Sequence, residues 1–323
     1  GLSDYIYVKL QSASDFRKLQ TKADEYDLTI VEQDEYMPLW YTLRCSENTS
    51  YTSLEVANRI FETEMFAAAV PDLMTYEDIL CTNDPNFNLL WGLDNTVDPT
   101  ADVNACDAWT ITKGSGANVA VLDQGIELTH NDLAANLSPL SYDTESNSSP
   151  SLMFGDHGTH CAGTVGAVGD NNTQVVGIAP ECTLFSISNS LAGTPNSRQK
   201  RADGINWAVA NGVDIISNSW SSGVQYQVID DAIDDALANG RGGLGCIIVF
   251  AAGNGSGSPV SYPANYTPGI LAVGSITSTG ARSGFSNIGP ELDVVAPGSS
   301  VYSTINSNGC LLYTSDAADE ERG

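Results

Sequence analysis

Residues 119–125 read VAVLDQG, and residues 155–163 read GDHGTHCAG. The first stretch is a continuous apolar run that ends on Asp123, as expected of a buried parallel strand with a polar residue at its carboxyl end. The second stretch starts a run of small residues with His157, and small residues let a helix pack closely against a sheet. These stretches predict a strand and a helix that bring an acid and an imidazole together.

The pattern around these stretches predicts an α/β fold. From about residue 88, short apolar runs alternate with segments of helical spacing, which is typical of a doubly wound parallel sheet. The runs expected to form buried strands are 119–122, 183–187, 213–217 and 246–251. The segments expected to form helices are 157–167, 198–211 and 227–239. Reactive side chains belong at the carboxyl ends of such strands, which is where Asp123 and Asn254 stand.

Residues 1 to about 80 predict a separate, small α+β unit. Strands are expected at 5–10, 28–31, 38–43 and 67–74. One helix would run from Ser12 or Ser14 to about Tyr26, and a second would cover 54–66. The side chains expected on the buried face of that second helix are Leu54, Ala57, Ile60, Phe61 and Met65. The β-α-β-β-α-β order is ferredoxin-like and carries no set of catalytic groups.

A polar stretch, 81–86, separates this unit from the rest of the chain, and we expect it to be an exposed loop. The chain is strongly acidic, with 40 Asp and Glu against 13 Lys and Arg and a formal net charge of −27. Such a field repels phosphate, so nucleic acid is not an expected partner. No apolar run is long enough to span a bilayer, so a membrane partner is not expected either. The chain begins at Gly1 without an initiator Met or signal peptide, and we expect an N-terminus that was processed or shortened.

The chain has seven cysteines and no C-x-x-C pair, so a zinc site is not expected. Cys81 and Cys106 flank a loop-rich stretch and are the best disulfide candidates in a secreted context. Cys161, Cys182 and Cys246 stand among apolar residues and are expected to be buried thiols.

Asp123, His157 and Asn254 occur in this order along the chain. They supply a carboxylate that orients a histidine, a general base, and an amide that donates to an oxyanion, and they call for a serine nucleophile. Each residue has an ordinary alternative: a turn acid, a core histidine, or a Gly-Asn-Gly turn. His157 and His160 also form an H-x-x-H pair, but it lacks the glutamate of a metalloprotease helix, so no metal ligands are assigned.

The motifs around these residues resemble those of the subtilisin-like serine proteases, the subtilase family, in its secreted bacterial form. The matching segments are Val-Leu-Asp123-Gln-Gly, His157-Gly-Thr-His-Cys-Ala-Gly in the Cys-bearing form of proteinase-K-like members, Ala-Ala-Gly-Asn254, His130-Asn-Asp-Leu and Val295-Ala-Pro-Gly. The resemblance covers about residues 84–308. It implies a serine-type endopeptidase that cleaves polypeptides with an Asp-His-Ser triad. It also implies secretion or a cell-surface location, no cofactor for the chemistry, and structural calcium at a site not yet located.

The resemblance also assigns a substrate-binding segment. Residues 217–223 match the family's strand that pairs with a bound peptide through its backbone. The residues implied to bind substrate are Ser219, Trp220, Ser221, Ala251, Ala252 and Gly253. The family usually has glycine where Ser221 stands, and Trp220 with Ser221 suggests apolar P1 and P4 side chains. Residues 1–80 resemble the family's inhibitory propeptide, so the chain's own first unit is an expected intramolecular inhibitor. Cleavage between the two units is expected within about residues 72–88.

The end of the chain departs from the family pattern. After Gly298 the family reaches Gly-Thr-Ser-Met-Ala and a long apolar helix, but this chain has neither. Ser315 is not assigned as the nucleophile, because only eight residues follow it and Asp316 and Asp319 would oppose an oxyanion. The string at 310–320 resembles the translation of a transposase adapter used for sequencing libraries.

We therefore expect 84–309 to be an incomplete peptidase domain and 310–323 to be an artefactual tail. The chain is then a zymogen fragment without its nucleophile and is predicted to be inactive. Two alternatives stay open. One is a pseudoprotease or peptide-binding domain that never had the serine. The other is an inhibitor, residues 1–80, fused to an inactive domain.

Overall fold

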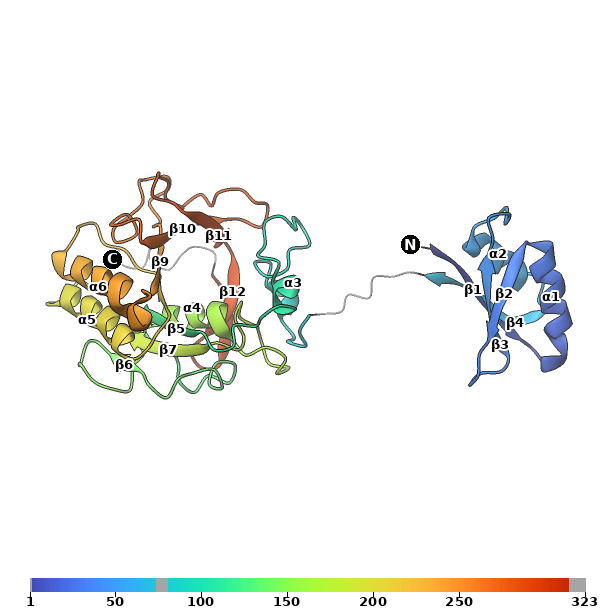
Figure 1. Cartoon of the computed structure of the whole chain (residues 1–323), viewed down its shortest axis with the longest axis horizontal. Coiled ribbons are helices and arrows are strands. Elements are labelled where there is room, and N and C mark those ends of the chain that lie inside the picture. Colours follow the sequence, from blue (N-terminus) through green and yellow to red (C-terminus); the bar gives the residue numbers. More distant parts are fainter. Residues whose placement is uncertain (1, 74–80, 314–323) are drawn as a thin grey trace. The chain divides into compact units, whose positions relative to one another are not determined.

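The computed structural model describes residues 2–73 and 81–313, which belong to two compact units, Gly1–Ile79 and Leu80–Gly323 (Figure 1). Each unit has its own buried core: the first has a single hydrophobic cluster, and the second has two. The predictions for residue 74 and for 314–323, including Ser315, concern residues outside the described ranges.

The first unit is an antiparallel sheet of strand order β2-β3-β1-β4 with two helices. Its elements are β1 (Leu2–Leu10), η1 (Ala13–Asp15), α1 (Phe16–Glu25), β2 (Leu28–Gln33), β3 (Trp40–Cys45), α2 (Ser53–Phe61) and β4 (Phe66–Leu73). The ferredoxin-like pattern predicted from the sequence is confirmed, because the two β-α-β halves interleave in one sheet. Ser12 caps the short η1 turn, its Oγ accepting from the Ser14 amide at 3.2 Å, and α1 follows directly.

The prediction for the second helix of this unit was wrong in its end and in its buried face. A capping box between Thr52 and Glu55 fixes its start. The helix ends at Phe61, and Glu64 has a positive φ of 56° that continues into β4 instead of a further turn. The buried side chains are Ser53, Val56, Ala57 and Ile60. Of the face predicted to be buried, Leu54, Phe61 and Met65 are 41%, 56% and 42% exposed.

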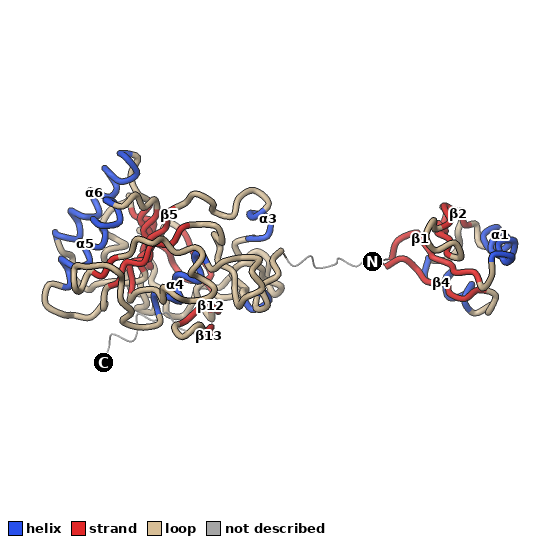
Figure 2. The backbone as a smooth tube through the Cα atoms, turned by 90° about the horizontal axis from the view of Figure 1, so that it is seen from below, coloured by secondary structure: helices blue, strands red, loops and turns tan. Residues whose placement is uncertain are grey.

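The second unit contains a seven-stranded sheet of order β11-β10-β9-β8-β5-β7-β6, in which every neighbouring pair is parallel (Figure 2). The strands are β5 (Asn118–Asp123), β6 (Tyr142–Asp143), β7 (Thr183–Ser188), β8 (Ile215–Asn218), β9 (Ile247–Ala251), β10 (Ile270–Ile276) and β11 (Val294–Pro297). The helices are α3 (Ala105–Trp109), α4 (His157–Gly166), α5 (Ser197–Ala210) and α6 (Gln227–Gly243), with a 3-10 turn η2 (Phe87–Leu89). An antiparallel hairpin of β12 (Val301–Ile305) and β13 (Gly309–Tyr313) completes the unit.

The sheet is covered on both faces, as the doubly wound prediction requires. In β5, Ala120 and Leu122 belong to the core shared with α5 and α6, whereas Val119 and Val121 belong to the core shared with α4. This alternation follows from the two-residue period of a strand. All four predicted strands and all three predicted helices of this unit exist. Strands β6, β10 and β11 were missed because they are short or rich in polar and small residues.

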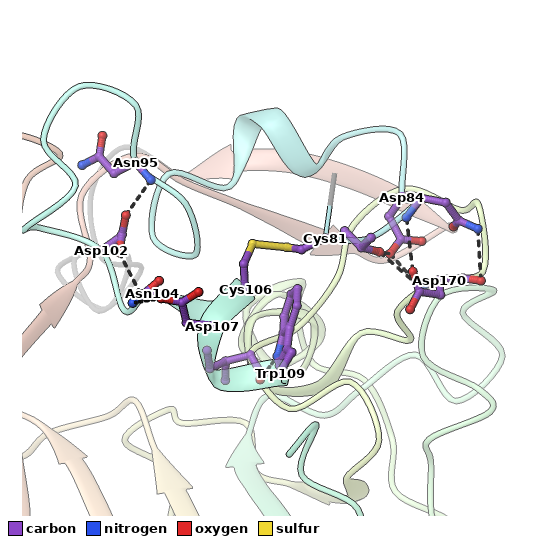
Figure 3. The surroundings of a disulfide bond; sticks show 12 residues. Cys81, Asp84, Asn95, Asp102, Asn104, Cys106, Asp107, Trp109 and Asp170 are labelled. Carbon is purple, nitrogen blue, oxygen red and sulfur yellow. Dashed lines mark hydrogen bonds between the residues drawn. A yellow bond between two sulfur atoms is a disulfide. The ribbon is translucent and has the colours of Figure 1, made fainter. Parts of the chain in front are cut away.

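The stretch 81–86, predicted to be an exposed separator, is instead built into the second unit (Figure 3). Cys81 forms a disulfide with Cys106, which confirms the predicted pairing. Thr82 and Asp84 are each 3% exposed, and Asp84 Oδ2 accepts a hydrogen bond from the Asp170 amide at 2.9 Å. The buried polar side chains of this stretch therefore form hydrogen bonds within the protein rather than with solvent. Among the described residues, no helix is both long and apolar enough to cross a membrane.

Candidate active site

Asp123 is the last residue of β5, at the carboxyl edge of the sheet, and it is 1% exposed. Its Oδ1 lies 2.7 Å from Nδ1 of His157 and also accepts from the Gln124 amide at 2.7 Å. Its Oδ2 is buried and has no hydrogen-bond partner within the described part of the chain. The carboxylate is thus held toward the imidazole by the backbone turn that follows the strand.

The turn after Asp123 requires glycine. Gly125 has a φ of 93°, and a Cβ on it would lie 1.9 Å from the carbonyl oxygen of Leu152. A Cβ on Gly158, in the first turn of α4, would lie 2.4 Å from the carbonyl oxygen of Gly125. The helix and the turn therefore approach each other backbone to backbone, which brings His157 within reach of Asp123.

His157 is the first residue of α4, and its side chain is 10% exposed. A carboxylate at Nδ1 favours the tautomer with the proton on that nitrogen, so Nε2 is the basic atom. His160 has a different role, because its Nε2 lies 3.2 Å from the carbonyl oxygen of Val301 in β12. That hydrogen bond ties α4 to the hairpin.

Cys161 was predicted to be a buried thiol, but it is half-buried beside the imidazole. Its Sγ lies 3.8 Å from Nε2 and 3.9 Å from Nδ1 of His157. Asp123, His157 and Cys161 each offer one ligand atom within 4.8 Å of the others. A metal ion held there would compete with the hydrogen bond between Asp123 and His157, so metal binding and general-base chemistry exclude each other. Cys182 and Cys246 are buried as predicted.

Asn254 follows β9 at the same edge of the sheet and is half-buried. Gly253 before it has a φ of 103°, and a Cβ there would lie 2.5 Å from Ser261 Oγ. The side chain of Asn287 holds this turn from both sides: its Nδ2 donates to the Ala252 carbonyl at 3.1 Å, and its Oδ1 accepts from the Gly255 amide at 2.6 Å. The backbone around Asn254 is therefore rigidly positioned.

The predicted substrate segment, Ser219 to Ser221, follows β8, which lies between β5 and β9 in the sheet. Among the described residues, no backbone hydrogen bond involves these three residues, whereas the next amide, of Ser222, donates to the Tyr262 carbonyl at 2.7 Å. Trp220 anchors the segment, because its ring packs edge-on against Phe250 at 5.0 Å. The segment therefore continues from β8 without backbone hydrogen bonds among the described residues, next to β5, which ends at Asp123, and β9, which precedes Asn254.

The Subtilase family matches residues 114–321 of the chain. The chain belongs to the subtilase family. This subtilase is similar to Subtilisin DY of Bacillus licheniformis, at 39% identity over 212 residues, which covers 63% of this chain and 71% of the relative. It is 36% identical to Thermitase of Thermoactinomyces vulgaris over 205 residues, covering 62% of this chain and 70% of the relative. A solved structure titled as a protease of Pseudoalteromonas arctica superposes with a TM-score of 0.64 at 28% identity, over 74% of this chain and 83% of that one.

Other relatives extend well beyond the region that they share with this subtilase. Subtilisin NAT of Bacillus subtilis subsp. natto is 36% identical over 59% of this chain, and the match covers 49% of the relative. The Calcium-dependent protease of Trichormus variabilis is 28% identical over 89% of this chain and 46% of its own length. The chain thus spans about half of these two relatives.

Sequence reasoning missed several residues that shape this subtilase site. Asn287 clamps the turn at Asn254 from more than thirty positions away, and no local pattern marks it. Asp84 stands in a stretch interpreted as a separator. Arg198 and Arg201 carried a usable signal, because basic residues are scarce in this chain and these two stand close together near the start of α5.

Proposed function

We propose that this chain carries the general-base and oxyanion half of a serine endopeptidase, in zymogen form and without its nucleophile. The observation that carries the proposal is the 2.7 Å hydrogen bond between the buried Asp123 carboxylate and His157 Nδ1 at the carboxyl edge of the sheet. Asp123 orients the imidazole and stabilises its charged form. His157 Nε2 takes the proton of a serine hydroxyl and later returns it to the leaving amine.

Asn254 donates a hydrogen bond to the oxyanion of the tetrahedral intermediate, an interaction of about 3–4 kcal/mol in transition-state stabilisation. An extended polypeptide pairs with the backbone of 219–221, and the half-buried Ala251 and Gly253 line the neighbouring wall. Ala252, predicted to bind substrate, is 2% exposed and belongs to the core. In the part of the chain that the structure describes, 219–221 have no backbone hydrogen bonds, which supports this role because buried or half-buried backbone groups normally find partners. The chemistry requires no cofactor.

The chain as given should not form an acyl-enzyme. A fluorophosphonate probe is expected to leave it unlabelled, because the Gly-Thr-Ser-Met-Ala nucleophile motif does not occur in the sequence. The measurement is intact-mass spectrometry after incubation with the probe. Labelling of Ser315 would overturn the inactive-fragment proposal while leaving the assigned roles of Asp123 and His157 in place.

The origin of the missing serine is tested at the gene. We propose that 310–323 is adapter-derived, and sequencing of genomic DNA past the codon for Gly309 decides this. A Gly-Thr-Ser-x-Ala codon run there would make the parent protein an active protease. The present tail at the same locus, or a substituted serine, would favour a pseudoprotease or peptide-binding domain instead.

The first unit is proposed to be the propeptide and intramolecular inhibitor of the second. We expect the cleavage between them at or before Cys81, within about residues 72–81. Cleavage beyond Cys81 is disfavoured because that residue is bound to Cys106 and because Thr82 and Asp84 are buried. Mass spectrometry of the mature form of an active version checks this. A mature N-terminus beyond Thr82 would contradict it.

Structural calcium is proposed at the buried acids behind α4. Asp132 is fully buried and Asp84 is 3% exposed. Burial chiefly, with the nearby Asp84 charge, raises the pKa of Asp132 to about 6, although hydrogen bonds from Asn171 and the Val175 amide act against this shift. A buried carboxylate with a second buried acid near it suits a divalent cation with oxygen ligands. When bound, the ion would supply charge compensation and no catalytic step.

Without calcium, Asp132 should destabilise the fold as pH rises. Its folded pKa of about 6 exceeds its unfolded value, so the folded state holds the extra proton and its stability falls between about pH 4 and 6. Asp132→Asn should remove this part of the pH dependence and the rise in Tm on adding calcium. Calorimetry with EGTA or calcium from pH 4 to 8 measures both. An unchanged calcium response in the variant would refute the assignment.

Secretion is proposed as well. The Cys81–Cys106 disulfide supports it, because such bonds persist in oxidising compartments.

A further inference from the structure

The loop after β8 carries two aromatic rings, and an arginine of α5 covers each of them. The Arg201 guanidinium lies 5.0 Å from the ring centroid of Trp220. The Arg198 guanidinium lies 4.7 Å from the ring centroid of Tyr226. Residues three positions apart on a helix share a face, so both cations face the loop at 219–226.

The positive charge of Arg198 is not neutralised by an acid. Within the described residues it forms no ion pair, and its Nη1 donates to Ser197 Oγ at 2.5 Å while its Nε is buried without a partner. The nearest basic neighbour, Lys200, is already paired with Glu145.

The place of these arginines in the helix increases the positive potential. Both stand in the first two turns of α5, where the helix dipole also presents its positive end. Cations at that end lower the stability of the helix. The two arginines therefore place positive charge beside the loop, at a position where that charge lowers the stability of α5.

A second observation in the same place indicates a ligand. Trp220 is 4% exposed, and its Nε1 has no hydrogen-bond partner among the described residues. The backbone of 219–221 is also without hydrogen bonds in that part of the chain. A buried indole N–H without a partner, a segment without backbone hydrogen bonds and the Arg198 guanidinium without an acidic partner, all judged among the described residues, together suit a bound molecule that brings acceptors and negative charge.

We propose that this loop is a subsite for an acidic side chain of the bound polypeptide. Arg198 would contact the Asp or Glu carboxylate through charge-assisted hydrogen bonds. Arg201, which is 3% exposed and donates from Nη2 to the Leu191 carbonyl at 2.6 Å, is a positioning residue that holds the Trp220 ring. The inference rests on the proposed pairing of peptide with 219–221, and it replaces the apolar preference that Trp220 suggested from the sequence.

The test is peptide binding to the full chain, measured by calorimetry and by tryptophan fluorescence at low ionic strength. A set of extended alanine-rich peptides carries one Glu at successive positions, each with a matched Gln peptide. At one position the Glu peptide should bind about tenfold more tightly than its Gln partner, and the ratio should shrink in about 0.5 M salt. If the first unit occupied the substrate segment, it would weaken the binding of every peptide by the same factor. The ratio of the dissociation constants of the Gln and Glu peptides is therefore the readout.

Variants assign the effect to these residues. Arg198→Gln should bring the Glu and Gln peptides within about twofold of each other. Arg201→Gln should shift the tryptophan emission and weaken every peptide, whereas Arg201→Lys should restore the charge but not the stacked emission. Arg241→Gln is the matched control: it makes the same charge change in the same unit, at a residue paired with Asp214 before the start of β8. It should keep the full ratio.

The failures can be told apart. Equal binding of Glu and Gln peptides at every position would overturn the acidic subsite and leave the proposed function standing. A preference that survives in the Arg198→Gln/Arg201→Gln variant would overturn the assigned residues. No peptide binding of any kind would overturn both this inference and the proposed substrate strand.

Discussion

Asp123→Asn should lower kcat by about 10⁴-fold in a form of the protein whose site is completed by a serine nucleophile. The amide that replaces the carboxylate can donate to Nδ1 and so favours the wrong tautomer of His157. The side chain keeps its shape, and the fold should keep its Tm within a few degrees. Steady-state hydrolysis of a chromogenic peptide, with active-site titration to count folded molecules, measures the effect.

The control for this variant is Asp143→Asn. Asp143 also ends a strand of the same sheet and is fully buried, but it accepts from hydroxyl and amide groups rather than from an imidazole. Asp143→Asn should lower the free energy of unfolding and change kcat little. If the two variants lost equal activity, the special role of Asp123 would be rejected in favour of a general loss of packing at the sheet edge.

The largest expected effect on stability comes from the disulfide. Replacing both Cys81 and Cys106 by Ser frees a loop of 25 residues, and closure entropy gives a loss of about 3.5 kcal/mol in the free energy of unfolding. For a unit of this size the Tm should fall by roughly 10 °C. Asp84, three residues after Cys81, should also be held less firmly against the Asp170 amide (Figure 3).

Thermal unfolding with and without reductant measures this loss. Reductant should bring the natural chain down to the Tm of the double variant and should leave the double variant unchanged. Thiol counting shows whether the disulfide has been broken. If it has and the Tm of the natural chain is unchanged, the disulfide contributes nothing to stability.

The pairing of Asp123 with His157 was predictable because both residues carry local signals. An acid that ends an apolar strand and a histidine that opens a helix of small residues are each visible in short windows. The parallel α/β pattern then requires that strand ends meet at one edge. Position in the sequence and a general rule of topology together specified the contact.

The arginine-covered loop could not be predicted in this way. Arg201 and Trp220 are far apart in the chain, and their contact depends on how α5 packs over the sheet beside β8. Cys161 stands four residues after His157 on α4, so helical spacing alone places its thiol beside the imidazole. Asn287, in contrast, reaches the turn at Gly253 from a distant loop, as Arg201 reaches Trp220. No periodicity encodes such contacts.

The misjudged face of α2 and the two buried side chains in the stretch 81–86 show the same limit. The apolar spacing identified the helix, but the capping box fixed where the helix starts. Three of the five residues expected in the core are exposed. The polar residues Thr82 and Asp84 indicated an exposed loop. In the structure both are buried, and Asp84 accepts a hydrogen bond from the Asp170 amide. By itself the sequence determined the fold class, the family motifs and the Asp–His pair, because these depend on local pattern and strand order. Only the tertiary structure decided which polar and charged groups are buried, and against what, because burial is a property of packed neighbours rather than of residue type.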